Sequence, residues 1–171
     1  LRYCGSGKIQ LPDFQRSWVW DEERIKGLIA SISQAFPVGA LMTLELKAAK
    51  DTFARRPIQG ADAAATSALP DQLLLDGQQR MTSLYQTCLR REVVQTVTPR
   101  LKLVKRWFYI DMRKAMDPTE DRENAIVSVP EDRRVKAAFD RKVELDLSTP
   151  ELEYQNFMFP LNQVFDSMNW M

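Results

Sequence analysis

Apolar and polar residues alternate along the chain in a pattern that predicts short strands interleaved with helices. Short apolar runs, several of them bounded by proline or glycine, are typical of buried or edge strands. These runs predict strands at residues 8–11, 40–46, 73–75, 107–112 and 126–129. The region at 47–70 has no such periodicity and is rich in Ala, Asp, Thr and Arg, so we expect an exposed loop or insertion there.

Apolar residues spaced three and four positions apart predict the helices. Asp21 is a favourable N-cap for a helix that runs to about Gln34. We expect its buried face to consist of Ile25, Leu28, Ile29 and Ile32. A second helix is predicted from Gln78 to about Arg91, with a buried stripe formed by Met81, Leu84, Tyr85, Cys88 and Leu89. Further helical regions are expected at 130–142, 150–155 and 160–168.

Composition narrows the class of protein. The 171 residues, 44% hydrophobic and 27% charged with a net charge of +1, suit one α/β (α+β) domain spanning 1–171. No apolar run approaches the ~20 residues of a membrane span, so we expect no membrane partner. Two cysteines are too few for a disulfide framework, which favours a cytoplasmic location. Histidine is absent, which excludes a Ser-His-Asp triad, a His-ligated zinc site and a His-dependent nuclease within these residues.

The segment LLLDGQQRMTSL at 73–84 carries the first candidate chemistry. It predicts a strand, a tight turn at Asp76-Gly77 and a helix that begins at Gln78. The start of a helix has unpaired N–H groups and a positive partial charge, which suit a phosphate, and Arg80 adds a guanidinium. Alternatively, the turn only connects two elements, with Asp76 as a helix cap and Gln78 and Gln79 in a solvated first turn.

The segment KIQLPDFQRSWVW at 8–20 contains the second set of candidate functional residues. Arg16 either contacts a phosphate beside Arg80 or forms a weak surface ion pair with an acid such as Asp13 or Glu22. Trp18 and Trp20 either pack in the core or a lid, or one of them covers a nucleobase.

Residues 100–106, RLKLVKR, form the best basic cluster. This cluster either contacts the DNA backbone or forms a solvated edge of a strand or helix. No aromatic residue alternates with the charges as a base-stacking site would require, so the solvated edge is the stronger interpretation.

Together, the two segments resemble the DGQQR-signature domain at the N-terminus of GmrSD-type, modification-dependent (type IV) restriction enzymes and related prokaryotic phage-defence proteins. Asp76 to Arg80 occupy the signature without substitution, and Gln15 and Arg16 fill the family's Gln-Arg pair. Trp20 fills the aromatic position that follows, and residues 37–39 match its Pro-x-Gly. The likeness covers residues 7–46 and 73–89; from about 92 onward it is weak.

The resemblance implies a ParB/sulfiredoxin-like fold, a small mixed sheet with flanking helices. It also implies that the domain binds a nucleoside triphosphate with Mg²⁺ or another divalent cation and hydrolyses it. In this interpretation Asp76, Gln78 and Gln79 are catalytic, with Asp76 either capping the helix or holding Mg²⁺ and a glutamine orienting the attacking water. Phosphate contacts would come from Gln15, Arg16, Gly77, Arg80 and Thr82.

The expected partners are a nuclease domain elsewhere in the same or a partner protein, and DNA bound through the full-length protein. We expect the sequence, which begins at Leu1, to be a piece of a longer protein. The alternative function is a non-hydrolytic module of ParB-like fold that binds a nucleotide, DNA or a protein partner. Nothing in the sequence separates a hydrolysing site from one that only binds.

Overall fold

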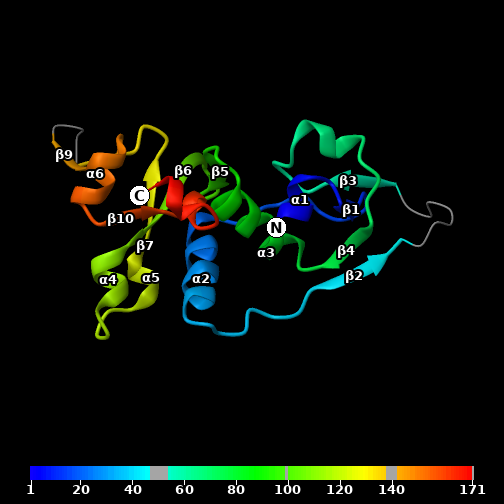
Figure 1. Cartoon of the computed structure of the whole chain (residues 1–171), viewed down its shortest axis with the longest axis horizontal. Helices are drawn as coiled ribbons and strands as arrows, with labels where there is room; N and C mark the ends of the chain where they lie inside the picture. Colours follow the sequence, from blue (N-terminus) through cyan, green and yellow to red (C-terminus); the bar gives the residue numbers. More distant parts are fainter. Residues whose placement is uncertain (47–53, 99, 138–141, 171) are drawn as a thin grey trace.

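The computed structural model describes residues 1–46, 54–98, 100–137 and 142–170, and it shows an α+β fold with several small sheets. This confirms the predicted fold class; the more specific ParB/sulfiredoxin likeness stays a prediction. Figure 1 shows β1–β4 with α1 at one end of the long axis, and β5–β10 with α2, α4, α5 and α6 at the other. The helix α3 lies between the two groups.

The first sheet has the strand order β2-β4-β1-β3. Its strands are β1 (Ile9–Pro12), β2 (Met42–Glu45), β3 (Arg55–Pro57) and β4 (Gln72–Asp76). β1 and β4 are parallel, whereas β2 and β3 are antiparallel to their neighbours and form the two edges. The short helix α1 (Arg2–Gly5) lies beside this sheet. Its core consists of Cys4, Leu11, Ile58, Leu74 and Tyr85.

The second sheet is antiparallel and is built on the long strand β6 (Leu103–Asp111). Its other strands are β5 (Val94–Val97), β7 (Ile126–Pro130) and β10 (Met158–Pro160). The remaining elements near it are α2 (Glu22–Ser33), α4 (Met112–Met116), α5 (Arg122–Ala125), a hairpin of β8 (Arg134–Lys136) and β9 (Val143–Asp146), and α6 (Pro150–Gln155). One core cluster lies between α2 and β5–β7, and another lies between the hairpin and β6.

The helix α2 forms where the apolar spacing predicts it. The Asp21 carboxylate accepts a hydrogen bond from the Arg24 amide at 2.8 Å, which confirms Asp21 as the N-cap. Ile25, Leu28 and Ile29 are buried. Ile32 was expected to be buried but is 38% exposed, because the last turn of α2 extends past the strands on which the helix packs (Figure 1).

Three other predictions were wrong in part. The described part of 47–70 is not an exposed loop: it holds β3 and the 3-10 turn Ala63–Thr66, with Ile58 and Ala65 buried. Residues 134–136 are the strand β8 rather than a helix, since Val135 packs on the core beside Leu145. The segment after Pro160 forms 3-10 turns.

The predicted helix at 78–91 is α3 (Gln78–Leu84), followed by a π-helical turn, Tyr85–Leu89. Of the predicted buried stripe, only Tyr85 is buried, whereas Met81, Leu84, Cys88 and Leu89 are partly buried. Four polar residues are buried instead: Thr82, Ser83, Gln86 and Thr87. Burial raises the pKa of the Cys88 thiol to about 12, so this thiol stays protonated and unreactive at neutral pH. In the described residues, no helix is long and apolar enough to cross a membrane.

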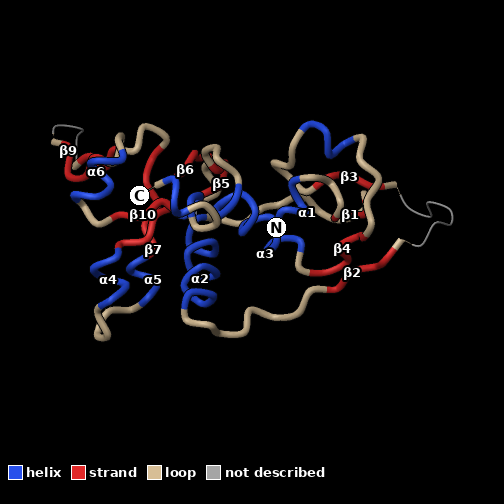
Figure 2. The backbone as a smooth tube through the Cα atoms, in the orientation of Figure 1, coloured by secondary structure: helices blue, strands red, loops and turns tan. Residues whose placement is uncertain are grey.

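Two long connections join the two groups of elements. The first crossing segment, residues 13–20, leads from β1 toward α2, and the second crossing segment, residues 34–41, leads from α2 back to β2. Figure 2 shows the second as a long loop outside the body of the protein. Both crossing segments pass α3, so the candidate site lies where they meet the DGQQR turn.

Candidate functional site

The turn between β4 and α3 requires glycine. Gly77 has a φ of +89°, a left-handed conformation that side chains with a Cβ rarely adopt. A Cβ built on Gly77 would also lie 2.3 Å from the Leu41 Cδ2 atom. The second crossing segment therefore packs directly on this turn.

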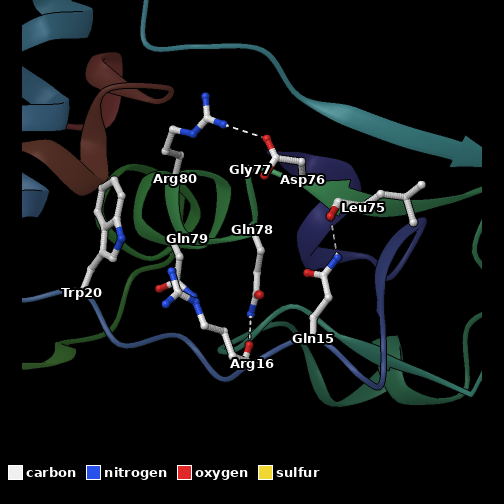
Figure 3. Close-up of a pocket in the computed structure, with 9 residues that line it drawn as sticks. All are labelled: Gln15, Arg16, Trp20, Leu75, Asp76, Gly77, Gln78, Gln79 and Arg80. Carbon is white, nitrogen blue, oxygen red and sulfur yellow. Dashed lines mark hydrogen bonds and ion pairs between the residues drawn. The ribbon is translucent and has the colours of Figure 1, made fainter.

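Asp76 ends β4 and does not cap the helix. Gly77 is the N-cap of α3, and no side chain makes a capping hydrogen bond there. The Asp76 carboxylate instead forms an ion pair with Arg80, with 3.2 Å between Oδ2 and Nη2 (Figure 3). The helix-cap interpretation of Asp76 is therefore wrong.

Arg80 also holds the second crossing segment. Its Nη1 donates to the Val38 carbonyl at 2.5 Å, and its Nη2 donates to the Ala40 carbonyl at 2.8 Å. Between these two residues, Gly39 has a φ of +91°, and a Cβ there would lie 2.4 Å from Arg80 Nη1. The Pro-x-Gly at 37–39 thus lets the backbone approach the guanidinium closely.

Gln78 and Gln79 hold the first crossing segment and are buried, with 7% and 9% exposure. Gln78 Nε2 donates to the Arg16 carbonyl at 2.8 Å. Gln79 Nε2 donates to the Ser17 carbonyl at 3.1 Å, and its Oε1 accepts from the Val19 amide at 3.0 Å. The solvated first turn considered from the sequence is therefore wrong.

Gln15 and Arg56 complete this hydrogen-bond network. Gln15 Nε2 donates to the carbonyls of Leu74 at 2.7 Å and Leu75 at 2.9 Å, which ties the first crossing segment to β4. Arg56 Nη2 donates to the Gln15 and Arg16 carbonyls at 2.9 and 3.1 Å. Sequence reasoning missed Arg56, because it lies in the aperiodic region at 47–70 and no motif marks it.

Arg16 has an exposed guanidinium. Among the described residues it makes no hydrogen bond or ion pair, although its carbonyl oxygen accepts from both Arg56 and Gln78. Of the two acids considered as its partner, Glu22 pairs with Arg106 instead, at 2.7 Å, and Asp13 forms no ion pair among the described residues. The backbone of Arg16 is thus fixed while its charged group stays available to a ligand.

These residues surround a cavity of about 370 Å³. Figure 3 shows its lining side chains, with Arg80 and Asp76 at the top, Trp20 at the left, and Gln15 and Arg16 at the bottom. The lining residues are Gln15, Arg16, Trp20, Leu75, Asp76, Gly77, Gln78, Gln79 and Arg80. The structure therefore brings together all the predicted site residues except Thr82.

Thr82 does not line the cavity. Its side chain is fully buried, and its Oγ1 atom has no hydrogen-bond partner among the described residues. The two tryptophans also separate: Trp18 is a core residue whose Nε1 donates to the Ser83 hydroxyl at 2.9 Å, whereas Trp20 lines the cavity.

The basic cluster at 100–106 lies on β6 and its approach. Lys105 pairs with Glu131 and Arg106 with Glu22, both at 2.7 Å. Acids thus neutralise two of its charges, which favours the solvated strand edge over a DNA contact.

The number of carboxylates in the cavity limits how a metal ion could be bound there. In the part of the chain that the structure describes, no group of three or more His, Cys, Asp or Glu side chains could hold a metal. Asp76 supplies the one carboxylate among the cavity residues. A Mg²⁺ ion there would take most of its ligands from phosphate oxygens and water, a common arrangement for Mg²⁺.

Comparisons with known proteins show which family the chain belongs to. The chain is 31% identical over 166 residues to an uncharacterised protein of Methanocaldococcus jannaschii, covering 94% of this chain and 27% of that protein. The chain thus spans about a quarter of the length of this curated relative. No solved structure matches the present chain. The model of the family described as "GmrSD restriction endonuclease, N-terminal domain" matches residues 3–168, so the chain belongs to that family.

Proposed function

We propose that this domain binds a nucleoside triphosphate with Mg²⁺ in the cavity around Asp76–Arg80 and hydrolyses it, as a regulatory domain of a modification-dependent restriction enzyme. One observation carries the proposal. The Arg16 guanidinium, without a partner among the described residues, lies in the same cavity as Arg80 and the glycine turn at the start of α3. A guanidinium and a helix start are groups that bind phosphate.

The electrostatics of the cavity support an anionic ligand bound with a cation. Two arginines and one carboxylate line it, so a triphosphate would meet a net positive wall. Among the described residues, the Asp76 carboxylate has no partner other than Arg80, and its side chain is 70% exposed, so it can reach a cation. Bound Mg²⁺ would bridge phosphate oxygens and offset their charge.

The hydrogen bonds distinguish the two signature glutamines. Both ends of the Gln79 amide are bonded to the first crossing segment, which makes Gln79 a positioning residue. Gln78 donates through Nε2, but within the described residues its Oε1 atom accepts no hydrogen bond. Gln78 is therefore the better candidate to orient an attacking water, the task that glutamine performs in other triphosphatases.

A non-hydrolytic binding module is the second candidate function. The observation that favours it is the same engagement of the glutamines with backbone atoms. No carboxylate other than Asp76 lines the cavity, so a general base is not evident. Such a site would bind a nucleotide and change shape without turnover.

The wider context is also a proposal. The family's description names a restriction endonuclease, and the chain matches 27% of its relative's length. We propose that a nuclease domain in the same or a partner protein cuts DNA, and that nucleotide binding here controls it.

Calorimetry and phosphate release with ATP, GTP, CTP and UTP, each with and without Mg²⁺, test the proposal. Arg16→Ala should lower affinity about tenfold or more, since a hydrogen bond to a charged group contributes roughly 1.5–3 kcal/mol. The melting temperature should stay unchanged because the guanidinium has no protein partner among the described residues. Arg24→Ala on α2, where the side chain is 65% exposed, is the matched control.

The outcomes separate the candidate functions. Binding with phosphate release in the parent, both weakened in the Arg16 variant, supports the hydrolase. Binding without release, even in the full-length protein with DNA present, leaves the binding module. If no triphosphate binds the parent protein, the hydrolase and the nucleotide-binding module are both wrong, and only binding of DNA or a protein partner remains of the alternative.

A further inference from the structure

Trp20 differs from the other tryptophans in how its indole N–H is used. Trp18 donates to the Ser83 hydroxyl at 2.9 Å, Trp107 to the Glu131 carbonyl at 3.1 Å, and Trp170 to the Glu153 carboxylate at 2.8 Å. The Trp20 N–H donates to no atom of the described residues. The Trp20 Nε1 atom is not among the buried side-chain donors without a partner, so it is open to the cavity, where it can donate to a ligand.

The position of Trp20 is fixed by its neighbours. Its ring is half-buried and packs against the core cluster beneath α2, and its carbonyl accepts from the Thr96 hydroxyl at 2.7 Å. The next residue, Asp21, forms a β-bridge with Val97 and caps α2. A ligand would therefore meet a preorganised ring, which lowers the entropy cost of binding.

The free N–H points into the cavity. Figure 3 shows the nitrogen edge of the Trp20 ring turned toward Gln79 and the Arg16 guanidinium, while Arg80 and Asp76 lie above them in this view. All of these residues line the same cavity. An aromatic ring with an unused donor thus lines the same cavity as the Asp76–Arg80 pair.

We propose that Trp20 recognises the nucleoside end of the ligand, with the indole N–H donating to an oxygen or nitrogen of the base or sugar. This rests on the proposed function and adds to it a division of the cavity: charged groups hold the phosphates, and Trp20 holds the nucleoside. An aromatic ring with one donor suits a planar, partly apolar group that carries acceptors, whereas a phosphate alone gains little from the ring.

The test compares nucleoside triphosphates with inorganic tripolyphosphate, which lacks a nucleoside. Both are titrated with Mg²⁺ into the parent protein and into Trp20→Phe, which keeps an aromatic ring but loses the donor. We expect the affinity for the tightest-binding nucleoside triphosphate to fall roughly three- to tenfold, the effect of one hydrogen bond, while tripolyphosphate affinity stays the same. Trp20→Leu should lower nucleotide affinity further.

Trp107→Phe is the matched control, because Trp107 donates to Glu131 and does not line the cavity. It should leave both affinities unchanged. Quenching of tryptophan fluorescence by the bound ligand should persist in Trp107→Phe and be largely lost in Trp20→Phe. This measurement does not depend on the change in affinity.

Each result is decisive. An equal loss for both ligands would place Trp20 at the phosphates and overturn the division of the cavity. No loss for either ligand, with quenching retained in Trp20→Phe, would remove Trp20 from the site. If the parent protein binds tripolyphosphate and binds every nucleoside triphosphate no more tightly, this inference is also wrong, but phosphate binding in the cavity stands. A parent that binds neither contradicts the proposed function itself.

Discussion

At the scale of single residues, the DGQQR side chains act mainly on the backbone of other segments. Gln78 and Gln79 hold carbonyls of the first crossing segment, and Arg80 holds two carbonyls of the second. A buried carbonyl or amide that loses its partner costs about 1–3 kcal/mol. The signature therefore shapes the cavity wall as well as supplying groups that can contact a ligand.

Gln79 gives the sharpest test of this positioning role. Gln79→Met keeps the side chain's size but removes both hydrogen bonds, to the Ser17 carbonyl and from the Val19 amide. We expect the free energy of unfolding, measured in urea, to fall by about 1–3 kcal/mol. Gln95→Met, at an exposed position on β5, should change it by less than about 0.5 kcal/mol.

Turnover measured on the same Gln79 variant separates positioning from catalysis. If phosphate release by the parent is lost in Gln79→Met while stability and nucleotide affinity are unchanged, Gln79 acts in the reaction itself. If Gln79 is a positioning residue, its substitution should instead lower the free energy of unfolding and the nucleotide affinity together.

At the scale of elements, the β4–α3 turn is set by Gly77 and by the contact with Leu41. Gly77→Ala should lower the free energy of unfolding by about 2 kcal/mol or more, because the left-handed conformation is strained and the new Cβ clashes. Chemical denaturation measures this loss directly.

A double variant separates the two causes. Leu41 is 48% exposed, so Leu41→Ala alone should cost little, but it removes the atom that a Cβ on residue 77 would meet. Gly77→Ala in the Leu41→Ala background should therefore lose less stability than in the parent. Equal losses in both backgrounds would mean that the clash with the second crossing segment does not contribute.

At the scale of the whole molecule, the cavity lies where two sheets, each with its own core cluster, are joined by the crossing segments. Its walls come from β4, α3 and the first crossing segment, while the second packs against the turn. Ligand contacts to Arg16 and Arg80 would thus act on both crossing segments. Such an arrangement suits a regulatory domain, as proposed above.

The absence of histidine leads to a prediction about the chain as a whole. The purified 171-residue chain should not cut modified or unmodified DNA with any triphosphate and Mg²⁺, as followed by gel electrophoresis. Asp76→Ala serves as the comparison. Cleavage that co-purifies with the parent and disappears in this variant would contradict the proposed division between a nucleotide-binding domain and a separate nuclease domain.

The sequence by itself determined the features that depend on neighbouring residues. The cap and apolar spacing of α2, the strand β4 and the glycine turn before α3 follow from local backbone preferences and from the contrast of apolar with polar positions. The DGQQR and Gln-Arg motifs located seven of the nine residues that line the cavity. The other two are Leu75, which the sequence placed only on a strand, and Trp20, which was left between two roles.

Contacts between groups that are far apart in the sequence could not be predicted. Arg56 reaches the first crossing segment from β3, and Gln10 donates a hydrogen bond to the carbonyl of the buried Ala65, far away in the sequence. The strand β8 forms instead of a helix because Val135 packs on a core shared with β6 and β7. Such contacts depend on the path of the whole backbone, and no local pattern of residues encodes that path, so they override local propensity.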